Sequence, residues 1–198
     1  MKNEDFDLNG NDLFFLLAHY EDELRSINQK ISHLYDMIVS IQNESAEKIR
    51  QASFHPQNTE LGARIQTSGG SDLSSVLQSV VSIKKEEIQD ISEQIAVVKA
   101  RKNQLTRIKI SYDLIAHCHE KEIFELFIEA ERVGKRPDTL IYQKGIRMRR
   151  AYYIKGKMLE VLSGIYYSSF TTLQLLQISP MGFKKAQRLF IKDTDTNR

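Results

Sequence analysis

The run from Lys144 to Lys157, K-G-I-R-M-R-R-A-Y-Y-I-K-G-K, carries the side chains with the most specific chemistry in this chain. It holds six cationic residues and two adjacent tyrosines, Tyr152 and Tyr153, around a thin apolar stripe. Cationic groups neutralise backbone phosphates, and aromatic rings stack on sugars or bases. A helix of this composition behind a tight turn is typical of a reader of duplex DNA.

Spacing within this run separates an inner face from an outer face. Ala151, Ile154 and Met158 recur three to four residues apart, which predicts a helix from about 147 to 162 with these side chains toward a core. Gly156 falls on the outer face, where a missing side chain allows close approach of a DNA strand or of another helix. The predicted DNA-binding residues are Arg132, Lys135, Arg136, Lys144, Arg147, Arg149, Arg150, Tyr152, Tyr153 and Lys157. The alternative is a solvated basic face.

The triplet His117-Cys118-His119 contains residue types that bind metals. Adjacent residues on a helix point about 100° apart and cannot converge on one ion, so we expect a core cysteine between surface histidines. No orienting carboxylate or glycine-rich pocket is recognisable beside Cys118, and the sequence contains no phosphate-binding P-loop. We therefore expect no metal, no cofactor and no enzymatic activity.

Charge is divided unevenly along the chain although the net charge is only +2. Residues 1–100 carry 9 Lys/Arg and 16 Asp/Glu, whereas residues 101–198 carry 19 and 10. An acidic scaffold joined to a basic end that binds polyanions would show this division.

Cellular context is indicated by three further features of the sequence. A single cysteine, Cys118, cannot form an intramolecular disulfide and favours a reducing compartment. The N-terminal residues M-K-N-E-D-F-D lack the apolar core of a secretory signal, and no stretch approaches the ~18 apolar residues of a membrane span. We expect a cytoplasmic protein without membrane contact.

Two long helices are predicted in the first half of the chain. Leu17, Tyr20, Leu24, Ile27, Ile31, Leu34, Ile38 and Ile41 alternate three and four residues apart, as on the seam of a coiled coil. This helix should begin near Asp12 as N-cap and fray beyond Glu47. After a flexible linker near 52–72, a second helix over about 73–110 carries the seam Leu77, Val81, Ile88, Ile91, Ile95, Val98 and Leu105, with Lys84 and Lys102 intruding. The two seams must pair with each other as a hairpin or with a second copy of the chain.

The second half is denser in apolar residues and predicts a small globular domain. A helix over about 106–130 ends at Gly134, and a short helix from Thr139 to Lys144 follows with Asp138 as N-cap. Gly145 supplies the turn before the basic helix. Residues 171–191 form a second helix–turn–helix outline, with Ser179 as N-cap and Pro180 at the first helical position. We interpret this last segment as a packing element or a second DNA contact.

The fold class is therefore all-α, a long N-terminal helical hairpin or coiled coil followed by a small helix-turn-helix domain. The predicted domains are residues 10–110, containing the linker, and residues 111–192, with the helix-turn-helix near 138–163.

The segment L-I-Y-Q-K-G-I-R-M-R-R-A-Y-Y-I-K-G-K-M-L, residues 140–159, resembles the C-terminal helix-turn-helix of phage-encoded transcription activators of Gram-positive bacteria, the ArpU-like proteins. Their C-terminal part is similar to the promoter-reading fourth region of sigma factors, and members often carry a Tyr-Tyr pair followed by basic residues. Residues 61–72 resemble the break between the two long helices of the longer members. The resemblance covers most of residues 10–165 and implies sequence-specific, promoter-reading DNA binding, with host RNA polymerase as a candidate partner.

These observations predict a DNA-binding transcriptional regulator encoded by a phage or mobile element. Its partner is double-stranded DNA, and the coiled coil sets the oligomeric state of a homo-oligomer. The rival interpretation is a coiled-coil structural or adaptor protein that binds another protein. RNA binding is the third, although no single-strand-binding motif is present.

Overall fold

The computed structural model describes residues 8–53 and 70–191, and within them the chain is helical with no β-strand, which confirms the predicted all-α class. Two compact units are formed: an arm unit, residues 26–101, and a globular unit, residues 8–25 and 102–191. None of the helices in the described ranges has the length and apolar character to cross a membrane. The helices are α1 (Gly10–Ala18), α2 (Tyr20–Ser53), α3 (Gly70–Asp113), α4 (His119–Val133), α5 (Pro137–Gln143), α6 (Met148–Tyr166), α7 (Thr172–Gln177) and α8 (Phe183–Phe190).

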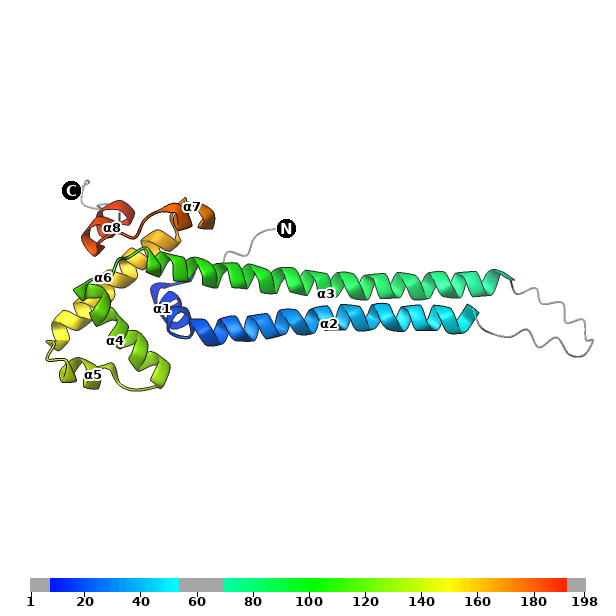
Figure 1. Cartoon of the computed structure of the whole chain (residues 1–198), viewed down its shortest axis with the longest axis horizontal. Coiled ribbons are helices and arrows are strands. Elements are labelled where there is room, and N and C mark those ends of the chain that lie inside the picture. The colour runs from blue at the N-terminus through cyan, green and yellow to red at the C-terminus, as the bar shows by residue number, and fades with distance from the viewer. Residues whose placement is uncertain (1–7, 54–69, 192–198) are drawn as a thin grey trace, which may run out of the picture. The chain divides into compact units, whose positions relative to one another are not determined.

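In the arm unit, α2 and α3 run antiparallel and side by side (Figure 1). The Lys99 ammonium donates a hydrogen bond of 2.8 Å to the Tyr35 hydroxyl, and Lys84 lies 3.8 Å from the Glu44 carboxylate. These contacts pair residues whose numbers rise on one helix and fall on the other, as an antiparallel pair requires. The predicted linker has its central residues, 54–69, outside the described range.

The predicted seam is partly buried within the single chain. Its buried members in the arm unit are Ile27, Leu34, Ile91, Ile95 and Val98, and four others, Ile31, Ile38, Ile41 and Ile88, are half-buried. Val81 is 53% exposed, and Leu77 lies outside the residues whose side chains are described. Lys84 intrudes as predicted but is matched by carboxylates of Glu44 and Glu87. A charged seam position can therefore be tolerated without a second chain.

The first helix starts earlier than predicted and is shorter. Asn9, not Asp12, is the N-cap: its side chain accepts from the amides of Asn11 and Asp12, and Asp12 accepts from the Asn9 amide in a capping box. The helix stops at Ala18 and α2 begins at Tyr20, where a single helix was predicted. Most of α1 is buried, so it belongs to a core rather than to a narrow seam; its buried residues are Leu13, Phe14, Leu16, Leu17 and Ala18.

The predicted helix over 106–130 is interrupted, because residues 114–118 leave α3 and turn into α4. In this break the Met181 amide donates to the Leu114 carbonyl at 2.8 Å, and the Ala116 amide donates to the Met181 carbonyl at 2.9 Å. This pairing holds Met181 in extended backbone, so Ser179 and Pro180 do not start a helix as predicted. The last helix, α8, begins at Phe183 with Gly182 as N-cap.

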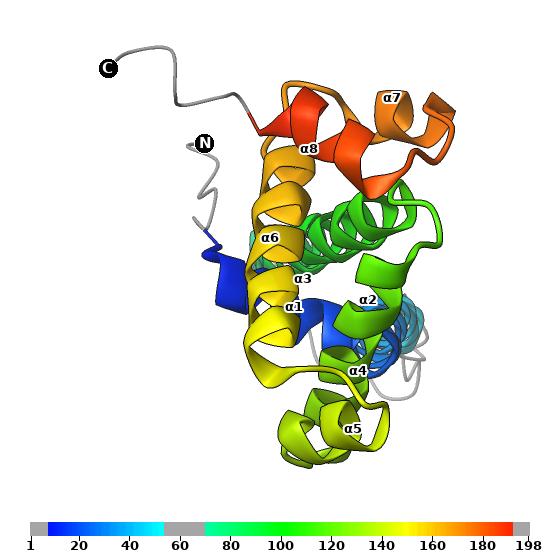
Figure 2. The ribbon, with the colours of Figure 1, turned by 90° about the vertical axis from the view of Figure 1, so that its left-hand side faces the viewer.

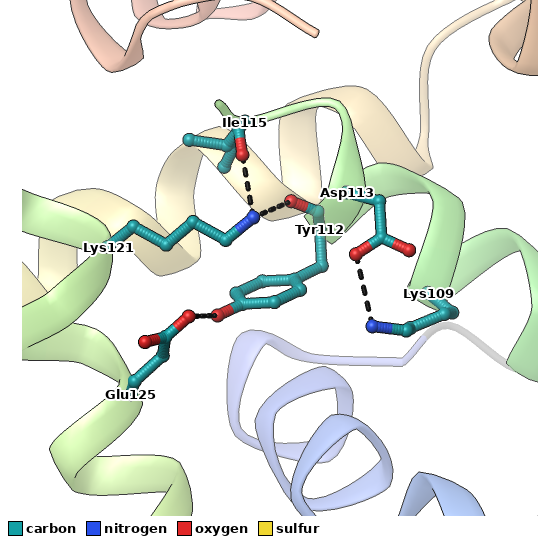
Figure 3. A network of polar contacts seen from close by, with 6 residues as sticks. All are labelled: Lys109, Tyr112, Asp113, Ile115, Lys121 and Glu125. Carbon is teal, nitrogen blue, oxygen red and sulfur yellow. Dashed lines mark hydrogen bonds and ion pairs between the residues drawn. The ribbon is translucent and has the colours of Figure 1, made fainter. Parts of the chain in front are cut away.

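A buried lysine joins the end of α3 to α4 (Figure 3). The Lys121 ammonium donates to the carbonyls of Ile115 at 2.7 Å and Tyr112 at 3.3 Å, and it lies 4.2 Å from the centre of the Tyr112 ring. The Tyr112 hydroxyl in turn donates to Glu125 at 2.8 Å. Burial lowers the pKa of Lys121, whereas burial and then the Glu125 bond raise the pKa of Tyr112. Lys121 thus bonds one carbonyl in the last turn of α3 and one in the segment that follows this helix.

The raised pKa of Tyr112 predicts a loss of stability in alkali. Above pH ~10 the unfolded phenol loses its proton while the folded phenol keeps it, so the free energy of unfolding falls by up to about 1.4 kcal/mol per pH unit. Tyr112→Phe removes this term, and the difference in stability between wild type and variant should shrink from pH 9.5 to pH 11.5. Urea unfolding followed by circular dichroism measures it. Parallel pH profiles for the two proteins would contradict the assignment.

The core of the globular unit is organised by α6, which packs against α1, α4, α5 and α8 (Figure 2). Arg107 of α3 caps the C-terminal end of α6 by donating hydrogen bonds to the carbonyls of Tyr166 at 2.6 Å and Ser168 at 2.8 Å. Near that end, a Cβ added to Gly164 would lie 2.7 Å from the Phe190 carbonyl oxygen. The end of α8 therefore approaches α6 more closely than any side chain at this position would allow.

Gly164 and Gly156 both lie on α6 but have different surroundings, so alanine substitutions at the two positions can be compared. A Cβ on Gly156 would meet no described atom within 4 Å, so close approach of a DNA strand or of another helix at this glycine stays a prediction. Gly156→Ala should raise the free energy of unfolding by roughly 1 kcal/mol through helix propensity. Gly164→Ala should lower it by about 1–3 kcal/mol, because Phe190 must move. Thermal unfolding of both variants measures the contrast, and stabilisation by both would refute the close approach.

Candidate nucleic-acid interface

Two short connections, one before α5 and one before α6, hold four of the predicted DNA-binding residues: Lys135, Arg136, Lys144 and Arg147. The first, residues 134–136, leaves α4 through Gly134 in the left-handed conformation, φ 66°, as predicted. It enters α5 with Pro137 in the first turn and Arg136 as N-cap. Asp138 was predicted to be this N-cap, but the helix starts two positions earlier than predicted, at Pro137, which places Asp138 inside the first turn.

The second connection runs from Lys144 to Arg147 and turns at Gly145, φ 67°, a conformation that side chains other than glycine rarely adopt. On one side Ile141 anchors α5 in the core, and on the other Ala151 anchors α6; both are fully buried. A short helix, a glycine turn and a longer helix are thus held on the same core.

The faces of α6 agree with the periodicity of the sequence. Ala151, Ile154 and Met158 are buried, as are Val161 and Leu162. Arg149 and Arg150 are exposed on the opposite side. The basic side chains at the start of α6 are therefore directed to solvent by the apolar stripe behind them.

The adjacent tyrosines have different environments. The Tyr152 hydroxyl donates to Asp138 at 2.8 Å, and its ring lies edge-on to Phe127 with centres 5.2 Å apart. That hydrogen bond, ahead of burial, raises the pKa of Tyr152. Tyr153 is 65% exposed and makes no hydrogen bond within the described residues. Tyr152 braces α5 and α4 against α6, whereas Tyr153 is open to a ligand.

Tyr142 was absent from the predicted site and is the most exposed of the large aromatic side chains described, at 83%. It follows the buried Ile141 at the end of α5, beside the turn that carries Lys144. Sequence could have indicated it, because a residue next to the only core anchor of a short helix must point away from the core.

Two lysines of α6 are occupied within the protein. Lys155 lies over the rings of Phe14 and Phe127, 4.2 and 5.2 Å from their centres, and burial lowers its pKa. Lys157, one of the predicted DNA-binding residues, donates to Glu160 at 2.7 Å, and this bond raises its pKa. Neither is a free cation in this structure.

The other seven predicted cations are all exposed, and none forms an ion pair within the ranges that the structure describes. We call them the basic surface: Arg132, Lys135, Arg136, Lys144, Arg147, Arg149 and Arg150. The only acidic residue between positions 132 and 150 is Asp138, which accepts the Tyr152 hydrogen bond. The starts of α5 and α6 both lack a side-chain cap. Cations around the positive end of a helix repel it, and a bound phosphate would offset this cost.

The described part of the chain contains no group of three or more His, Cys, Asp or Glu side chains that could hold a metal ion. His117 and His119 both face Glu122, at 3.0 and 3.5 Å. Cys118 is the N-cap of α4 and only half-buried, so its predicted place in the core is wrong. The reason is the break between α3 and α4, which removes this triplet from a helix interior.

Comparison of the chain with protein-family models, with curated proteins and with solved structures finds no match in any of the three. The resemblance to ArpU-like activators therefore stays an inference from residues 140–159.

The two tyrosines provide a stability test of the brace. Tyr152→Phe keeps the ring against Phe127 but loses the hydrogen bond to Asp138, and should lower the free energy of unfolding by up to about 1 kcal/mol. Tyr153→Phe, the matched control one position away, should change it by less than about 0.5 kcal/mol. Chemical denaturation of the full chain measures both. Equal effects would show that the Tyr152 contact contributes nothing.

Proposed function

We propose that this protein binds double-stranded DNA through the basic surface, with α6 as the element that enters the major groove. The observation that carries the proposal is the concentration of seven exposed cations in nineteen residues that contain one acidic residue, with no ion pair from any of the seven to another described residue. A surface of this kind is costly unless a polyanion covers it, because like charges repel and no internal partner relieves them.

Geometry favours duplex DNA as the polyanion. The short helix α5, the turn at Gly145 and the longer helix α6 follow the order of a helix-turn-helix, in which the N-terminal residues of the second helix contact base edges. Arg147, Arg149 and Arg150 occupy those positions, while Arg132, Lys135 and Arg136 would hold backbone phosphates. Tyr142 and Tyr153 add exposed rings to the same end of α6.

Regulation of transcription is the role that the resemblance to ArpU-like activators supports, with promoter DNA as the target and host RNA polymerase as the proposed partner. The arm unit would set the spacing of two copies in a homo-oligomer.

Salt dependence and one double variant test the proposal. If four of the seven cations contact phosphates, raising salt from 50 to 200 mM should weaken binding to a labelled random duplex by roughly two decades. Arg149→Ala with Arg150→Ala should weaken it at least tenfold at 100 mM salt. Fluorescence anisotropy measures the affinity, and circular dichroism checks that the helices are intact.

A control of equal charge is available in the arm unit. Lys30→Ala with Lys85→Ala removes two exposed cations away from the basic surface and should change DNA affinity by less than about twofold. An equal loss of DNA affinity in both double variants would show that binding depends only on the net charge of the protein. Full affinity of the Arg149/Arg150 variant would reject α6 as the reading helix.

A further inference from the structure

The helices α7 and α8 expose leucines that the core does not use. Leu173 and Leu176 of α7 are 73% and 60% exposed, and Leu189 of α8 is 59% exposed. Only Leu175 of α7 and Ala186 of α8 are buried. Burial of one leucine side chain stabilises by about 1.5–3 kcal/mol, so three left in water on fourteen residues of helix are an unused source of binding energy.

The exposed leucines lie on two helices that follow one another in the chain. Leu173 and Leu176 are three residues apart and share a face of α7. The rings of Phe170, just before α7, and Phe190, at the end of α8, lie edge-on with centres 6.2 Å apart. This contact brings the start of α7 to the end of α8, where Leu189 lies. Scattered apolar residues need no explanation, but a cluster marks an interaction site.

All charged side chains in the region around α7 and α8 are positive. Residues 161–191 contain no aspartate or glutamate. Their three cations, Lys184, Lys185 and Arg188, are exposed on α8, and no ion pair to them exists within the described residues. Lys185, Arg188 and Leu189 are three and four residues apart and share a face. The surface is therefore both apolar and basic, and we name it the C-terminal surface: Leu173, Leu176, Lys184, Lys185, Arg188 and Leu189.

We propose that the C-terminal surface binds an acidic amphipathic helix of a partner protein. An apolar face with spaced leucines would cover Leu173, Leu176 and Leu189, and its carboxylates would meet Lys184, Lys185 and Arg188. Nucleic acid fits this surface poorly, because phosphate oxygens would leave the leucines uncovered. The basic surface shows the contrast, since its exposed large side chains are tyrosines, which stack on bases and sugars.

Binding here is independent of the proposed DNA site. Asp138 of α5 contacts α6 at Tyr152, and Phe190 of α8 contacts α6 at Gly164. Twelve residues of helix correspond to about 18 Å, and Figure 2 shows α5 and α8 at opposite ends of α6. One globular unit can therefore hold DNA and a protein segment together.

A defined peptide pool tests the proposal on the full chain. The peptides are sixteen residues long, with leucine fixed at four positions spaced three and four apart and Glu, Asp, Lys, Gln and Ala varied elsewhere. Selection against wild type should enrich peptides rich in Glu and Asp. Fluorescence anisotropy of an enriched peptide should show at least a tenfold weaker affinity for Leu173→Ser with Leu176→Ser, and likewise for Lys184→Gln with Lys185→Gln.

A matched control lies in the arm unit, where Val39→Ser with Val97→Ser removes two equally exposed apolar side chains and should leave peptide affinity within about twofold. Enrichment of basic or uncharged peptides, or of none, would overturn the proposal. So would a tenfold loss of duplex DNA affinity in the Leu173/Leu176 variant, which would assign this surface to DNA. Self-association of wild type that this variant abolishes would assign it to a second copy.

Discussion

The apolar stripe of α6 is the constraint on which the globular unit depends. Ala151, Ile154, Met158 and Leu162 are buried among α1, α4, α5 and α8. Because that stripe fixes the rotation of α6 about its axis, it also decides that Arg149, Arg150 and Tyr153 face solvent. The same burial places α5 at one end of the helix and α8 at the other. Rotation of α6 by one residue position would hide the arginines and expose the core, at a cost of several kcal/mol.

Basic residues have two distinct roles in the globular unit. Arg107 and Lys121 satisfy carbonyl groups at the ends of α6 and α3, and Lys155 covers two phenylalanine rings. Lys157 is paired with Glu160. These four contribute to the positive charge of the second half of the sequence but not to a surface that attracts a polyanion. Of the cations that form no ion pair within the described residues, seven lie in positions 132–150, and Lys184, Lys185 and Arg188 lie on α8.

We propose that the globular unit, with the basic surface at one end of α6 and the C-terminal surface at the other, joins nucleic acid to a second protein. The globular unit offers both surfaces on a single core, held by capping bonds and by the close approach of Phe190 to Gly164. In the arm unit, Ile27, Leu34, Ile91, Ile95 and Val98 of the seam are buried within one chain.

The sequence by itself determined the helical class, the seam of the arm, the stop at Gly134 and the outward face of α6, because each depends on local periodicity or on one glycine. Only the tertiary structure decided the rest. The Met181 backbone pairs with residues 114–116, so α8 starts later than Ser179 and Pro180 predict. Tyr152 and Tyr153 are chemically identical neighbours, and only the position of Asp138 makes one a brace and leaves the other free. Long-range contacts of this kind leave no trace in local spacing, since they join residues far apart in the chain.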